Sequence, residues 1–97
     1  MLNDEVGFSE IYIVCGRTDL RYGIDSLARV LRFLGIENPA TAGTLYLFCG
    51  RRSDRIKGLV WEGDGFLLLY KKLANGSFPW PRNASEVKSL TPGYPNS

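Results

Sequence analysis

The sequence predicts a small single α+β domain, with a strand, one main helix, and then a three-stranded antiparallel meander on which the helix packs. Three observations carry this prediction: a strand-like run near the N-terminus, one helical apolar stripe after it, and three closely spaced strand-like runs. The chain has 97 residues, 44% of them hydrophobic, which fits one globular domain. We expect its core over about residues 10–81 and an irregular tail over 82–97.

The first predicted strand covers residues 11–15, Ile-Tyr-Ile-Val-Cys, which are mostly β-branched or aromatic and stop at Gly16. An apolar stripe follows, with spacings of four and three residues, at Leu20, Ile24, Leu27, Leu31 and Leu34. This spacing places the five side chains on one face of a helix. Thr18 and Asp19 are candidate N-caps. Because Gly23 weakens the first turn, we expect the helix proper from about Ile24 to Leu34, ended by Gly35.

Three further strands are predicted at Thr44–Cys49, Arg55–Trp61 and Phe66–Lys71. Their connections, residues 50–54 and 63–65, are short and rich in Gly and Asp, which favours antiparallel hairpins. Leu45 to Phe48 and Phe66 to Tyr70 are apolar on both faces of the strand. One helix covers one face of such a sheet. We therefore expect the other face to be covered by the tail, by a second copy in a homo-oligomer, or by another protein.

Composition argues against several functional classes. The sequence has no histidine and two cysteines, Cys15 and Cys49. Without histidine, a Ser-His-Asp or Cys-His catalytic site cannot be built, and a zinc site lacks ligands. No apolar run is long enough to cross a membrane, and residues 1–10 carry acids but no basic residue, unlike a signal peptide. We expect a cytoplasmic protein with reduced thiols, no membrane partner, no cofactor and no metal.

The positive charge is clustered although the net charge is only +2. Cations crowd the connection at 50–57, where we single out Arg51, Arg52, Arg55 and Lys57, and two more, Arg17 and Arg21, follow the first strand. Arginine suits phosphate because its planar fork donates two parallel hydrogen bonds. The cluster therefore predicts nucleic-acid binding through a basic hairpin. A solubilising hairpin tip, with Asp54 paired to a neighbouring arginine, is the alternative interpretation.

Catalytic sites have little support in the sequence. Asp54, Glu62 and Asp64, with Lys57 nearby, are the candidates for a metal-dependent nuclease. Asp54 and Asp64 belong to opposite ends of one strand, however, and Asp64 between two glycines is typical of a turn. No glycine-rich phosphate loop opens a helix. Trp61, Tyr70, Trp80 and the phenylalanines could stack on bases, but core packing is the better explanation for most of them. We assign no catalytic residue.

Two stretches resemble a known family. They are Thr18 to Ala28, TDLRYGIDSLA, and Gly43 to Pro81, GTLYLFCGRRSDRIKGLVWEGDGFLLLYKKLANGSFPWP. Both are similar to the signature segments of the small accessory protein, commonly called TnpB, of insertion-sequence-66-type bacterial mobile elements. This family is distinct from the RNA-guided nuclease that shares its name. The resemblance covers about residues 10–91.

The resemblance implies a non-catalytic role in transposition, a form of DNA recombination in which a separate transposase carries the catalytic carboxylates. It implies as partners DNA at the element ends, the transposase and other element-encoded proteins. Two molecular roles stay open: a DNA-binding factor, or an interaction module that joins the transposase to its partners without touching DNA. The positions that match the family motif are Asp19, Arg21, Gly23, Asp25, Arg51, Arg52, Asp54, Arg55, Lys57, Trp61, Gly65, Tyr70, Lys71 and Trp80.

Two details of the resemblance carry structural expectations. We expect Gly23 and Gly65 to be required by the backbone conformation. Similar proteins continue after Leu90-Thr91 with an amphipathic helix. This chain instead runs into Pro92-Gly93, and proline and glycine oppose a helix there. We therefore expect a tail shortened relative to the family, which would leave the second sheet face more exposed.

Overall fold

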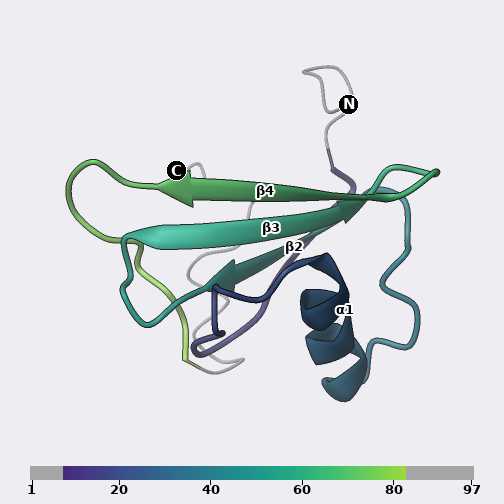
Figure 1. Cartoon of the computed structure of the whole chain (residues 1–97), viewed down its shortest axis with the longest axis horizontal. Coiled ribbons are helices and arrows are strands. Elements are labelled where there is room, and N and C mark those ends of the chain that lie inside the picture. The colour runs from purple at the N-terminus through teal and green to yellow at the C-terminus, as the bar shows by residue number, and fades with distance from the viewer. Residues whose placement is uncertain (1–7, 83–97) are drawn as a thin grey trace.

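The computed structural model describes residues 8–82 and combines one helix with one four-stranded sheet (Figure 1). In chain order the elements are β1 (Glu10–Ile13), α1 (Ile24–Phe33), β2 (Thr44–Cys49), β3 (Arg55–Trp61) and β4 (Phe66–Lys72). The expected bounds of β2 and β3 are reproduced, β4 is one residue longer, and β1 begins and ends earlier than predicted. Except for Arg82, the expected irregular tail lies outside the described residues.

The sheet is mixed, with the strand order β1-β2-β3-β4. The three later strands follow one another antiparallel, as the short connections predict, with Phe48 opposite Lys57 and Lys57 opposite Tyr70. The first strand pairs parallel to β2, with Tyr12 opposite Tyr46. A parallel pair needs a long crossover connection, and α1 supplies it. The predicted meander therefore describes three of the four strands and not the whole sheet.

The helix packs through one face against the sheet. Leu27, Ala28 and Leu31 are its buried residues, and Leu27 and Leu31 are fully buried. They meet Tyr46, Phe48 and Leu59 from the central strands, with Val14 beside them; Phe66 and Leu68 pack at the edge of this core. Full burial of a leucine or phenylalanine side chain contributes about 1.5–3 kcal/mol. This core fixes α1 to one face of the sheet.

The start of the helix differs from the prediction. Gly23, and not Thr18 or Asp19, is the N-cap, and no side chain caps the first turn. Asp19 is used one turn earlier: its carboxylate accepts the backbone N–H of Arg21 at 2.9 Å, and its carbonyl accepts that of Tyr22 at 3.1 Å. The residues after β1 therefore form a separate turn before α1 begins.

The second face of the sheet is partly covered. Alternation along the strands directs Leu45, Leu47, Val60, Leu67 and Leu69 away from α1. Leu45 and Val60 are buried, and the other three are partly buried. Among the described residues, the large apolar side chains that are exposed are instead Tyr12, Tyr22, Phe33, Leu34 and Tyr70. The expected homo-oligomer through this face stays a prediction.

The segment after β4 returns along the end of the sheet (Figure 1). Its backbone N–H groups at Leu73 and Phe78 donate to the carbonyls of Asp54 and Ser53, at 2.7 and 2.6 Å. The indole Nε1 of Trp80 then donates to the carbonyl of Val14 at 2.9 Å. These bonds attach residues 73–82, here called the strap, to the connection between β2 and β3 and to the residue after β1.

Candidate nucleic-acid interface

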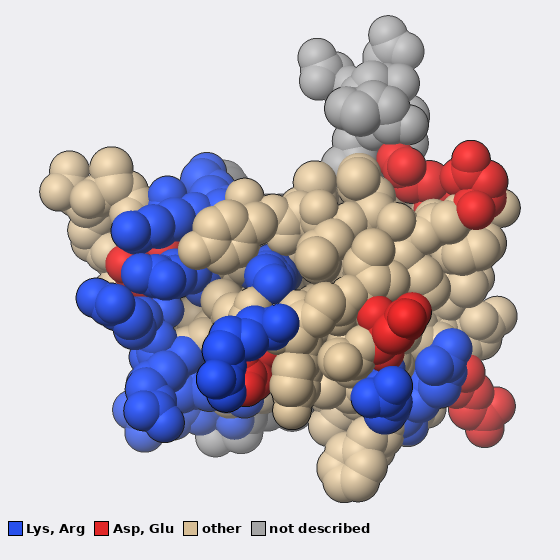
Figure 2. Space-filling model, in the orientation of Figure 1, with Lys and Arg blue, Asp and Glu red and all other residues tan. Residues whose placement is uncertain are grey.

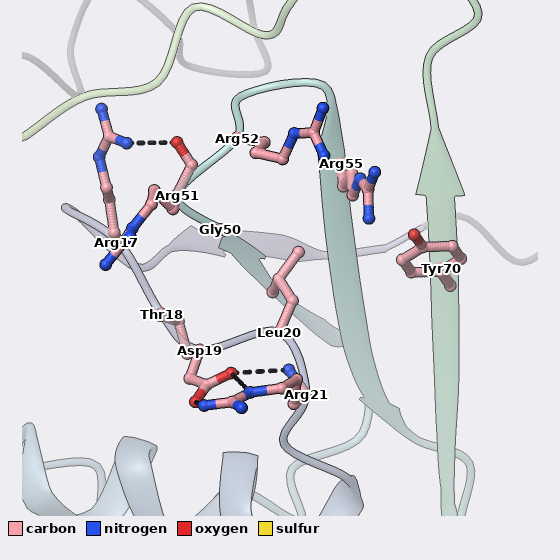
Figure 3. A pocket seen from close by; sticks show the side chains of 10 residues that line it. All are labelled: Arg17, Thr18, Asp19, Leu20, Arg21, Gly50, Arg51, Arg52, Arg55 and Tyr70. Atoms are coloured by element: carbon pink, nitrogen blue, oxygen red, sulfur yellow. Dashed lines mark hydrogen bonds and ion pairs between the residues drawn. The ribbon is translucent and has the colours of Figure 1, made fainter.

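A cleft of about 660 Å³ opens at the end of the sheet where β1 and β2 finish (Figure 3). One wall is formed by residues 17–21, which follow β1. The other is formed by residues 50–52, which follow β2, and by Arg55, the first residue of β3. Tyr70 from β4 completes the lining. The parallel pairing of β1 and β2 explains the meeting of these segments, because parallel strands end at the same edge of a sheet. The backbone N–H of Thr18 donates to the carbonyl of Cys49 at 2.8 Å and holds the two segments together.

Gly50 allows the two walls to approach closely. A Cβ at this position would lie 2.9 Å from Cγ of Leu20, closer than packed carbon atoms tolerate. Figure 3 shows Leu20 between the two arginine-bearing segments. The sequence pattern does not predict this contact. Its only sequence signal is a glycine directly after an apolar strand.

The cleft gathers arginines that are far apart in the sequence. Five of the six predicted nucleic-acid-binding residues line it: Arg17, Arg21, Arg51, Arg52 and Arg55. Among the lining residues within 8–82, Asp19 is the one acidic residue, so their formal excess is four positive charges. Lys71 and Lys72 end β4 at the same edge of the sheet, since Arg55 pairs with Lys72. Figure 2 shows basic side chains concentrated at one end of this face and acidic ones mostly toward the other.

The sixth predicted residue, Lys57, lies beside the cleft and does not line it. Its ammonium donates to the carbonyl of Tyr22 at 3.1 Å and lies 5.9 Å from the centre of the Tyr70 ring. That distance is within the range of a cation–π contact. Lys57 therefore connects the turn before α1 to the aromatic wall of the cleft.

Asp19 occupies the guanidinium of Arg21. The two side chains form a forked pair, with Nε to Oδ1 at 3.0 Å and Nη2 to Oδ2 at 2.8 Å. The Arg21 side chain, through this pair, and the Arg21 backbone N–H lower the pKa of Asp19 from 3.8 to about 2. Asp19 is therefore ionised at neutral pH, and an anionic ligand has to compete with it for Arg21.

The other cleft arginines differ in how much of their donor capacity is used. Arg17 donates to the carbonyl of Arg51. Arg55 pairs with Asp54 at 3.3 Å. The ion pair between Asp54 and a neighbouring arginine, expected if the hairpin tip only solubilises the protein, is therefore present at Arg55. Within residues 8–82, the exposed guanidinium groups of Arg51 and Arg52 have no hydrogen-bond or ion-pair partner. These two groups are the ones most available to a ligand.

The aromatic candidates separate clearly. Trp61 packs edge-on against Phe66, with ring centres 5.1 Å apart, and Trp80 is held by its bond to Val14. Tyr70 is 54% exposed and borders the cleft. Among the described aromatic residues, Tyr70 is the one that lies beside the arginines in the cleft.

The acidic candidates for a nuclease do not converge. Asp54 precedes β3 and Asp64 follows it, so the two carboxylates lie at opposite ends of a seven-residue strand. In the described part of the chain, no three residues of the His, Cys, Asp or Glu types form a group able to hold a metal ion. Cys15 and Cys49 are free thiols, and burial raises the pKa of Cys49.

Two motif glycines have a different role from the one predicted. Gly23 has φ −92°, and neither it nor Gly65 has a positive φ or a neighbour that an added Cβ would meet. The left-handed conformation in the turn after β3 falls on Gly63, with φ 97°. The expectation that the backbone requires Gly23 and Gly65 is therefore wrong. Asp25, another motif position, is exposed in the first turn of α1, where its negative charge interacts favourably with the helix dipole.

No helix within residues 8–82 has the length and apolar character needed to span a bilayer.

Most of the chain is similar to known proteins. A family model described as "IS66 Orf2 like protein" matches residues 9–94. The uncharacterized protein y4hO of Sinorhizobium fredii is 36% identical over 83 residues, which are 84% of this chain and 70% of the relative. A second protein of that organism, y4jC, is 28% identical over 71 residues, 73% of this chain and 60% of the relative. No solved structure matches.

Proposed function

The chain belongs to the IS66 Orf2-like family of insertion-sequence accessory proteins, and from this premise we propose that it supports transposition by binding DNA through the arginine-lined cleft. The observation that carries the proposal is the convergence of five arginines, from two separate segments, on one concave surface. Arginines on such a surface bind phosphates through charge and paired hydrogen bonds. The DNA at the ends of the mobile element is the proposed ligand, and we propose that the protein binds it in the cytoplasm.

Affinity from phosphate contacts has a characteristic dependence on salt. Each neutralised phosphate releases condensed counterions, so the logarithm of the binding constant falls linearly with the logarithm of salt concentration, with a slope of about −0.9 per contact on duplex DNA. Arg51 and Arg52 have no partner to lose within the described residues, and they should therefore contribute most.

The test is a fluorescence titration of the full chain with a labelled duplex from an element end and with a scrambled duplex, at several salt concentrations. We expect binding at low salt that weakens as salt rises. Replacing Arg51 and Arg52 together by alanine should weaken binding to both duplexes. It should also reduce the magnitude of the salt slope by about 2, one per lost contact. Arg29 and Arg32 on α1 are exposed and lie outside the cleft, so their double alanine variant is the matched control. Absence of binding at low salt, or an equal loss in the control, would count against the proposal.

A second role is favoured by one observation outside the cleft. Phe33 and Leu34, at the end of α1, are 89% and 48% exposed. Exposed apolar side chains at one point of a surface are typical of protein contacts. The alternative is therefore an interaction module that joins the transposase to other element-encoded proteins without DNA contact. It predicts that a pull-down of the transposase survives the Arg51/Arg52 double variant and is lost on Phe33→Ser.

We propose no catalytic activity for this chain, because transposase chemistry needs carboxylates held together. Incubation of the purified protein with plasmid and element-end DNA, in Mg²⁺ or Mn²⁺, should leave both uncut. Cleavage that persists after further purification would overturn this part of the proposal.

A further inference from the structure

We propose that the cleft binds an unpaired stretch of DNA, with backbone phosphates on Arg51, Arg52 and Arg55 and one base stacked on the ring of Tyr70. This inference rests on the proposed function and names the form of DNA that the site selects. Single-stranded or frayed ends would be preferred over intact duplex.

The cleft places a flat aromatic surface beside a phosphate-binding surface. Tyr70 and the three arginines line the same cavity, and the tyrosine is 54% exposed (Figure 3). A duplex presents its phosphates outward and keeps its base faces stacked inside, so an aromatic ring within a protein cleft cannot reach them. An unpaired base has a free face, and stacking on aromatic side chains is the usual way in which proteins bind it.

The separation between the two kinds of contact suits a nucleotide. Arg55 stands opposite Lys72 in the pairing of β3 with β4, and Tyr70 lies two residues before Lys72 on β4. Two residues along an antiparallel strand span about 7 Å. The sugar of a nucleotide likewise holds base and phosphate several ångströms apart. The cleft volume of about 660 Å³ is also within the range of about 300–1,000 Å³ that holds small ligands.

The tyrosine ring has a cationic neighbour that favours one orientation before any ligand binds. Its cross-strand partner is Lys57, whose ammonium lies 5.9 Å from the ring centre. That ammonium is itself fixed by the carbonyl of Tyr22 at 3.1 Å. A ring positioned in this way loses little conformational freedom when a base stacks on it, which favours affinity. Lys57 therefore contributes by positioning Tyr70 and by adding positive charge near the stacked base.

The experiment compares three labelled probes of equal length with the full chain at low salt. They are a single-stranded DNA, the duplex of the same sequence, and a sugar–phosphate strand that lacks bases. We expect the single strand to bind more tightly than both other probes. Tyr70→Leu should weaken single-strand binding about tenfold, the loss of one stacked base, and change binding of the other two probes less than twofold. Tyr70→Phe keeps the ring and should stay within twofold of the original chain.

Matched variants separate this inference from the proposed function. Tyr12→Leu removes an exposed tyrosine from β1, outside the cleft lining, and should leave all three affinities unchanged. If the Arg51/Arg52 double variant weakens every probe but Tyr70→Leu weakens none, the stacking inference is overturned and DNA binding by the cleft stands. If no probe binds the original chain, the proposed function itself fails. Thermal unfolding of each variant, with rescue by Tyr70→Phe, separates loss of the ring from loss of the fold.

Discussion

Asp19 sets how much positive charge the cleft offers to a ligand. It holds Arg21 in a forked ion pair and contributes the only carboxylate among the described residues that line the cleft. Arg51 and Arg52 carry no such partner within residues 8–82. The site therefore contains guanidinium groups in different states: Arg21 and Arg55 are ion-paired, Arg17 donates to a backbone carbonyl, and Arg51 and Arg52 are available to a ligand.

Replacing Asp19 by asparagine should raise the affinity for DNA several-fold at low salt. The change removes one negative charge from the cleft and releases the Arg21 guanidinium to the phosphates. The measurement is the same titration, with Asp25→Asn as the control, because Asp25 is an exposed acid on α1 outside the cleft lining. An equal gain in both variants would mean that only net charge matters and that the ion pair does not restrain binding.

DNA affinity should be nearly independent of pH between about 5 and 9. The cleft has no histidine, and arginines keep their charge throughout this range. The pKa of Asp19 is lowered from 3.8 to about 2, so its ion pair stabilises the fold above about pH 4, and this contribution is lost as pH falls toward 2. Thermal unfolding should therefore show a small difference between the original chain and Asp19→Asn at pH 5 that disappears near pH 2. A difference that grows on acidification would contradict this sign.

At the scale of the secondary-structure elements, most of the site is formed by two connections between elements and not by any one strand. The segment after β1 and the segment after β2 meet because these strands are parallel, and the bond from Thr18 to Cys49 extends their pairing. The strap at 73–82 then holds the β2–β3 connection through the carbonyls of Ser53 and Asp54. The basic connection is thus braced from both sides, which supports a pre-formed binding surface.

Gly50→Ala should destabilise the protein by about 1–3 kcal/mol and weaken DNA binding, because the added Cβ would lie 2.9 Å from Cγ of Leu20 and force the two walls apart. Gly65→Ala is the matched control, since its added Cβ meets nothing and its φ is not positive. That change should be neutral or stabilise by up to about 1 kcal/mol. Chemical denaturation and the DNA titration measure both effects. Equal stability of the two variants would refute the close contact at Gly50.

At the scale of the whole molecule, the fold separates the tasks of core and site. The core lies between α1 and the central strands, while the cleft lies at the end of the sheet and uses side chains from the connections. Trp80, which the sequence presented as a candidate for stacking, serves the fold through its bond to Val14. The net charge of +2 conceals a cleft whose lining residues, in the part of the chain that the structure describes, have an excess of four positive charges. Binding is therefore expected to follow the local field rather than the total charge.

Local patterns were sufficient to predict most elements. The spacing of Leu27 and Leu31 placed α1, and the short Gly/Asp-rich connections placed β2, β3 and β4 as a meander. They could not show how β1 pairs, because a strand pattern carries no information about its neighbour. They also misplaced the helix N-cap, since Asp19 can complete either a helix start or a separate turn.

The sequence by itself determined most of the elements, the absence of histidine, the family resemblance, and the identity of the basic residues, because each depends on composition or on short-range spacing. Only the tertiary structure decided that Arg17 and Arg21 share a cleft with Arg51, Arg52 and Arg55, that Lys57 stands aside, and that Tyr70 completes the lining. The physical reason is the parallel pairing of β1 with β2 across α1. This long-range contact brings two distant connections to one edge of the sheet, and no local pattern specifies it.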